Sequence, residues 1–137
     1  MKKSLISIII FTILFLVSCA VSEEESIAKE IESTTDELNQ IAVQIDTALE
    51  VDNIGDVREL VPEYAAKAEK FEQLADRYAE LVGDSDDPEV KEYVKELKQD
   101  RIIIHENVEE WITQLQTYDD IMAVLNTILL ITEIVEE

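Results

Sequence analysis

Apolar residues recur at alternating spacings of four and three along three long stretches of this sequence. The first seam is Ile27, Ile31, Thr34, Leu38, Ile41, Ile45 and Ala48. The second is Val57, Val61, Tyr64, Ala68, Phe71, Ala75, Tyr78 and Val82, and the third is Val90, Val94, Leu97, Arg101, Ile104, Val108, Trp111, Leu115 and Tyr118. This spacing gives coiled-coil-like seams that pack at about 20°. We therefore expect an all-α chain in which three long helices form an antiparallel bundle.

Two turn-forming stretches separate the seams. The first helix should end near Asp52-Asn53-Ile54-Gly55, because Asn and Gly suit a C-terminal turn. The second should start after Asp56, or be kinked or restarted at Pro62, which has no backbone N–H. Gly83 to Asp87 should form the next turn, with Asp87 capping a helix that begins at Pro88.

The C-terminal segment 121–135 is apolar nearly all round, so a helix there must be buried. Either the chain turns at Thr117-Tyr118-Asp119-Asp120 and folds back as a fourth helix, or the third helix continues and pairs with another chain through 121–135. The continuous heptad phase favours the extension. We prefer the fold-back, because an exposed apolar patch of this size is a liability on a monomer.

The N-terminus reads as an export signal. Lys2 and Lys3 precede an apolar run, Leu5 to Val17, that is too short to span a bilayer, and the only cysteine, Cys19, follows it. A single cysteine cannot form an internal disulfide. The segment Leu16-Val17-Ser18-Cys19 resembles the lipobox of prokaryotic lipoproteins, in which aliphatic, permissive and small residues precede an obligatory cysteine.

This resemblance implies that residues 1–18 are a cleaved signal peptide and that Cys19 carries a diacylglycerol, often with palmitate or another acyl group on the new N-terminus. Two or three acyl chains make a stable anchor. The protein would then lie on the extracytoplasmic side of a cell membrane or outer membrane. Residues 19–22 would be a very short tether, because Ser22 and Glu25 fit a helix capping box, and residues 23–137 a single helical domain.

The chain is strongly acidic, with 32 acidic and 11 basic residues. Loss of Lys2 and Lys3 with the signal leaves nine basic residues against 32 acidic ones, a formal charge of −23 on residues 19–137. Such a surface repels nucleic acid and anionic headgroups, so we expect no nucleic-acid partner. The partners compatible with such a surface are cationic molecules, divalent ions, or proteins recognised through apolar contacts. A simpler explanation of the acidic residues is that they keep the helix faces solvated.

Catalytic and metal-binding patterns are poorly matched. Cys19 is assigned to lipid, and the only histidine, His105, lies in the middle of an expected helix, so we expect no enzyme and assign no catalytic residue. Asp84 to Glu89 begins like a calcium loop, but Pro88 stands where a ligand is required and Glu89 where glycine is required. We expect no metal site and no cofactor. His105 with Glu109 could hold a metal only weakly, and a solvated or hydrogen-bonded histidine on a helix face is the better interpretation.

Arg101 could receive an anionic ligand, although local carboxylates are the more plausible partners on a helical seam. A candidate partner surface comprises Trp111, Tyr118, Ile121, Leu125 and Ile128. Aromatic residues are enriched at binding hot spots, yet at heptad spacing they more often belong to the core.

We expect a lipid-anchored interaction or structural module, with a protein partner or self-association. The alternative is a small-ligand or cation-binding lipoprotein. An envelope enzyme would need a reactive constellation that the sequence does not display.

Overall fold

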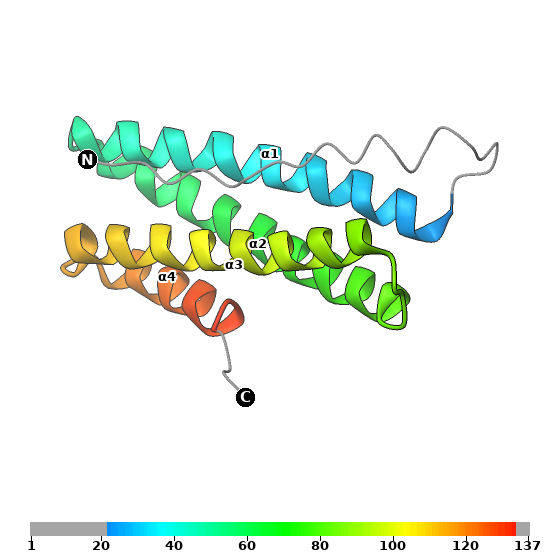
Figure 1. Ribbon diagram of the computed structural model, residues 1–137. Helices are drawn as coiled ribbons and strands as arrows, with labels where there is room; N and C mark the ends of the chain where they lie inside the picture. The colour runs from blue at the N-terminus through cyan, green and yellow to red at the C-terminus, as the bar shows by residue number, and fades with distance from the viewer. Residues whose placement is uncertain (1–21, 134–137) are drawn as a thin grey trace.

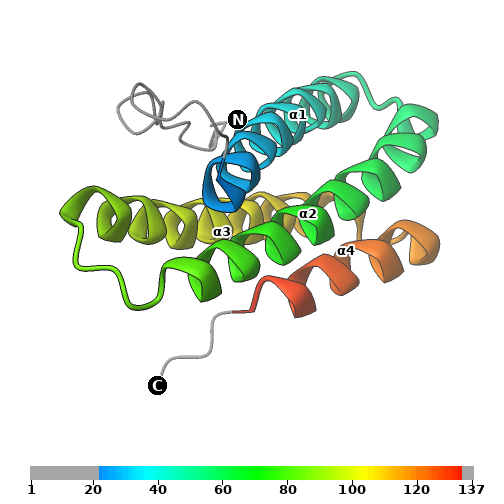
Figure 2. The same ribbon diagram turned by 90° about the vertical axis from the view of Figure 1, so that its right-hand side faces the viewer.

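The computed structural model describes residues 22–133, and the regular secondary structure of this part of the chain is all α-helical (Figure 1). It contains four helices, α1 (Glu23–Glu50), α2 (Ile54–Val82), α3 (Pro88–Leu115) and α4 (Asp119–Ile131). The predicted all-α class is confirmed. Consecutive helices run in opposite directions (Figure 1), and α2 lies between α1 and α4 (Figure 2).

Side-chain caps fix where the long helices begin. The Ser22 Oγ accepts a hydrogen bond from the Glu25 backbone N–H at 3.2 Å, and the Asp87 Oδ1 accepts one from Glu89 at 2.9 Å. Pro88 takes the first helical position, where its missing N–H costs nothing. These starts follow the sequence-based expectations.

The first helix ends close to the predicted position, but the expected glycine does not form the turn between α1 and α2. The residue with a left-handed backbone is Asp52, with φ of 55°, rather than a glycine. Asp52 donates to the Leu49 carbonyl at 3.2 Å, and Asn53 to the Ala48 carbonyl at 2.8 Å, which is the Schellman pattern of helix ends. Aspartate tolerates this conformation better than most side chains. Gly55 consequently lies inside the first turn of α2.

The second helix therefore begins earlier than expected. It starts at Ile54 rather than after Asp56, because the Asn53 Oδ1 accepts a hydrogen bond from the Asp56 N–H at 3.1 Å. Pro62 lies within α2, which continues as one helix on both sides of it. The side chain of Pro62 is exposed.

The seams supply most of the core. α1 packs along α2, and α4 packs against both α2 and α3. The largest fully buried side chains include Ile31, Leu38, Ile45, Tyr64, Phe71, Ile104, Trp111, Leu115, Leu125 and Ile128. In the first half of α3 the buried face is shifted relative to the predicted seam, because Tyr93 and Asp100 are buried whereas Val90 and Val94 are only half-buried.

The chain folds back after α3 and forms α4. α3 ends at Leu115, whose carbonyl accepts a hydrogen bond from the Tyr118 N–H at 3.0 Å, and α4 begins at Asp119. Ile121, Leu125 and Ile128 form the buried face of α4. Within residues 22–133, no helix combines the length and the apolar character needed to cross a membrane.

Candidate functional site

The predicted lipid-attachment residue, Cys19, lies outside the described residues. The same holds for the predicted signal peptide, residues 1–18. The described chain begins at Ser22, which caps α1. Only Ala20 and Val21 separate Cys19 from this cap in the sequence.

The structure places four residues of the predicted partner surface in the interior. Trp111, Ile121, Leu125 and Ile128 are 1%, 2%, 0% and 0% exposed, and Tyr118 is half-buried at the N-terminal cap of α4. The four buried side chains belong to the core because α4 folds back onto α2 and α3. They cannot present a docking surface in this fold. On its outer face α4 exposes Leu130, of which 71% is accessible.

Trp111 links three helices within the core. Its Nε1–H donates to the Oδ1 of Asp46 on α1 at 2.8 Å. Its ring meets that of Tyr64 on α2 edge-to-face, with centroids 4.8 Å apart and an interplanar angle of 85°. Buried tryptophans usually find such a hydrogen-bond acceptor. The pair therefore cross-links α1 and α3 through the middle of the bundle.

Tyr64 and Asn107 extend this buried polar cluster. Asn107 is 6% exposed and lies near the Tyr64 hydroxyl, but the two groups fall short of hydrogen-bonding geometry. Burial raises the pKa of Tyr64 well above its ordinary value, and Asn107 partly opposes this shift. The cluster is enclosed by helices, so we interpret it as a structural element of the core.

Arg101 binds carboxylates of α2. Its Nε donates to the Glu72 Oε1 at 2.8 Å, and its Nη2 contacts the Glu72 Oε2 at 2.8 Å and the Asp76 Oδ1 at 3.3 Å. Burial raises the pKa of Glu72, and the positive charge of Arg101 opposes that shift. The role of Arg101 is structural, as expected, but its carboxylate partners lie on α2 and not among the local ones predicted on its own helix, so the ion pair joins α2 to α3.

His105 connects α3 to the end of α4. Its Nδ1 lies 2.9 Å from the Thr132 Oγ1, which itself donates to the Ile128 carbonyl at 2.7 Å. The Nε2 lies 3.9 Å from a carboxylate oxygen of Glu109. No group of three or more His, Cys, Asp or Glu side chains suited to a metal ion occurs between residues 22 and 133.

The acidic turn before α3 serves the helix start. The Asp87 N–H donates to the Ser85 Oγ at 3.2 Å, while its carboxylate caps Glu89. The Asp87 carboxylate is therefore engaged by the backbone of α3. This geometry is that of a capped turn.

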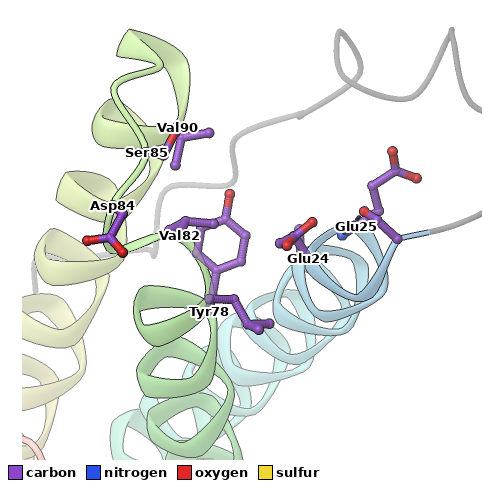
Figure 3. Close-up of a pocket in the computed structure, with 10 residues that line it drawn as sticks. Glu24, Glu25, Tyr78, Val82, Asp84, Ser85 and Val90 are labelled. Carbon is purple, nitrogen blue, oxygen red and sulfur yellow. Dashed lines mark hydrogen bonds between the residues drawn. The ribbon is translucent and has the colours of Figure 1, made fainter.

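A cavity of about 460 Å³, which no sequence pattern indicated, lies at one end of the bundle. It lies where the start of α1 meets the end of α2 and the turn into α3 (Figure 3). Its lining comprises Ser22, Glu24, Glu25, Ala28, Tyr78, Leu81, Val82, Asp84, Ser85 and Val90. These residues come from three separate parts of the sequence, so no local spacing indicates that they share a site.

Comparison with protein-family models, curated proteins and solved structures gave no match to this chain.

Proposed function

We propose that this protein is a lipid-anchored, acidic helical protein of the prokaryotic cell envelope that acts as a membrane-proximal protein-interaction or structural module. The anchor is a diacylglyceryl group on Cys19, on the extracytoplasmic side of the cell membrane or outer membrane. The observation that carries the proposal is the lipobox-like Leu16-Val17-Ser18-Cys19 segment, which ends three residues before the Ser22 cap of α1.

The short tether determines where the domain works. Three residues span at most about 10 Å from Cys19 to Ser22. The start of α1 is therefore held at the membrane surface, and the domain cannot search far from it. A partner must itself be membrane-proximal.

The proposed module is an antiparallel bundle of three long helices braced by α4. Support comes from contacts that join helices distant in sequence. Asp46 on α1 accepts a hydrogen bond from Trp111 on α3, and Glu72 on α2 pairs with Arg101 on α3. Such cross-links suit a stiff structural or docking unit.

The charge distribution favours a protein partner with a cationic surface over nucleic acid. Several basic side chains already contact acidic ones in the described part of the chain. These pairs are Arg58 with Asp120, Lys67 with Glu37, Arg77 with Glu23, and Arg101 with Glu72. The acidic excess of the sequence thus faces outward largely uncompensated. We propose a non-catalytic role, which agrees with the contacts of His105 to Thr132 and Glu109.

The anchor is tested by expressing the full chain in a bacterium with an alkyne-tagged fatty acid. We expect the wild-type protein to be labelled, to begin at Cys19 by mass spectrometry and to fractionate with membranes. Cys19→Ala should lose the label and processing, whereas Ser22→Ala, three residues away, should keep both. An unlabelled wild-type protein that remains uncleaved would refute the anchor.

The membrane-proximal role is tested by inserting about 20 Gly/Ser residues between Val21 and Ser22, which adds a mean reach of roughly 25 Å. Photo-crosslinking from exposed positions of α1 in intact cells should capture a partner with the native tether and lose it with the long one. The same crosslinked species at the same yield with both tethers would contradict the proposal.

A second candidate function, binding of a small ligand or cation, is favoured by one observation, the cavity beside the start of α1. Its volume of about 460 Å³ falls within the roughly 300–1,000 Å³ typical of small-molecule sites.

A further inference from the structure

The cavity between α1, α2 and the start of α3 has two chemically distinct parts. Apolar side chains, Ala28, Leu81, Val82 and Val90, line part of it. Polar and acidic side chains, Ser22, Glu24, Glu25, Tyr78, Asp84 and Ser85, line the rest. Its lining contains acidic residues but no lysine or arginine. A charged ligand that fits this lining is therefore a cation with an apolar portion.

Tyr78 is a fixed polar group inside this cavity. Its side chain is only 2% exposed, and its ring packs edge-to-face on that of Tyr93 with centroids 5.0 Å apart. Figure 3 shows its hydroxyl directed into the cavity, toward the side of Ser85 and Val90. No residue between 22 and 133 forms a hydrogen bond to that hydroxyl. Because this oxygen is accessible from the cavity rather than sealed in the core, a ligand that enters the cavity can hydrogen-bond to it.

Glu24 supplies the charge beside this hydroxyl. It reaches from the first turn of α1 toward Tyr78, whereas Asp84 points to the opposite side (Figure 3). Burial, together with the negative charges of Glu24 and Asp87, raises the pKa of Tyr78 to about 12. Tyr78 therefore stays neutral at physiological pH, and its oxygen remains able to accept a hydrogen bond next to a carboxylate.

We infer that this cavity binds a primary organic ammonium ion that carries a short apolar group. The ammonium group donates to the Tyr78 hydroxyl oxygen and to the Glu24 carboxylate, and the apolar group packs on Val82 and Val90. Charge-assisted hydrogen bonds of this kind are the strong ones. The inference deepens the ligand-binding alternative above, and it does not depend on the lipid anchor because every lining residue lies between 22 and 90.

The first test uses the full chain in an uncharged detergent, with ¹³C-labelled tyrosine rings followed by NMR. Titration with hexylammonium should shift the Tyr78 ring signals saturably, and Tyr78→Phe identifies those signals. Tyr64, which lies outside the cavity lining, serves as an internal control. Hexan-1-ol has the same stem without the charge and should give no saturable shift. Equal binding of hexan-1-ol would overturn the inference. So would the absence of a saturable shift with both amines, hexylammonium and the lipid amine tested below.

Matched variants test whether Glu24 is the carboxylate that binds the ammonium group. Glu24→Gln should weaken hexylammonium binding roughly tenfold or more, because it removes a charged acceptor. Glu59→Gln removes an exposed carboxylate near the other end of α2, roughly 30 Å away along the helix, and should leave binding unchanged. Circular dichroism confirms that both variants fold. Equal affinities for the two folded variants would overturn the role of Glu24.

The same chemistry could come from a soluble amine or from a lipid headgroup. Phosphatidylcholine vesicles with and without stearylamine separate these sources, with the full chain reconstituted into both. A Tyr78 shift that requires stearylamine and is absent with hexylammonium identifies a membrane amine, and the reverse identifies a soluble one. A cavity that responds to neither is not an amine site, whatever the outcome of the Cys19 labelling.

Discussion

Removing the carboxylate of Asp46 should destabilise the protein by leaving a buried indole N–H unpaired. The Trp111 side chain is 1% exposed and Asp46 is 7% exposed, so water cannot readily replace the 2.8 Å hydrogen bond between them. An unsatisfied buried donor costs about 1–3 kcal/mol. We therefore expect Asp46→Ala to lower the free energy of unfolding by that amount. Asp46→Asn keeps an acceptor and should cost less.

The complementary change leaves the carboxylate without its donor. Trp111→Phe keeps a ring against Tyr64 but removes the Nε1–H, and a hydrogen bond to a charged group contributes about 1.5–3 kcal/mol. Because either single substitution already breaks the bond, Asp46→Ala combined with Trp111→Phe should cost less than the sum of the two. The expected coupling energy is about 1.5–3 kcal/mol.

Urea unfolding followed by far-ultraviolet circular dichroism measures all four proteins of this cycle. Fluorescence is unsuitable, since Trp111 is the only tryptophan. Asp36→Ala, at an exposed position of the same helix, controls for loss of charge and should change stability by less than about 0.5 kcal/mol. If Asp46→Ala changed the free energy of unfolding as little as Asp36→Ala, the Asp46–Trp111 hydrogen bond would contribute nothing to stability. Additive effects of Asp46→Ala and Trp111→Phe would lead to the same conclusion.

Three further predictions concern other contacts. Arg101→Gln should lower the free energy of unfolding by about 1–3 kcal/mol, because it removes the partner of the buried Glu72 carboxylate. The matched Arg58→Gln breaks an exposed ion pair and should leave the urea midpoint unchanged. If both substitutions lowered stability equally, burial of Glu72 would not explain the effect of Arg101→Gln. The pKa of Tyr78 is about 12 in the folded protein against an ordinary 10.0, so the folded state holds that proton more tightly and stability should fall as pH rises from 10 through 12. Urea titrations in that range should show a smaller fall for Tyr78→Phe, and an unchanged fall would show that another group is responsible. A chain ended at Thr117 should lose cooperative unfolding, because α4 would no longer cover α2 and α3. Light scattering and circular dichroism that showed a folded monomer would contradict the core role of α4.

The heptad seams predicted the helices well because each long helix buries one continuous stripe. Every residue of the first seam is buried, including Thr34, whose hydroxyl donates to the Glu30 carbonyl at 2.7 Å. Caps were equally predictable, since Ser22 and Asp87 act on residues only two or three positions away. These features depend on local sequence, which a single chain displays directly.

The buried polar residues were not predictable in this way. Asp46, Glu72 and Asp100 are charged residues that local patterns assign to solvent, yet all three are less than a tenth exposed. Asp46 and Glu72 are tolerated because Trp111 and Arg101, tens of residues away in the sequence, supply their donors. Helical spacing fixes which residues share a face, but it does not determine which faces meet.

The cavity escaped the sequence analysis for the same reason, and its position connects the two proposals. Ser22 both caps α1 and lines the cavity, so a tether of about 10 Å from Cys19 would hold the cavity next to the membrane. The α1–α2 turn lies at the opposite end of α1, about 40 Å away for a helix of 28 residues. An amine in the lipid headgroup layer could then reach Tyr78 and Glu24, and a membrane-proximal partner would meet the same end of the bundle. The far turn, by contrast, would lie beyond the reach of either.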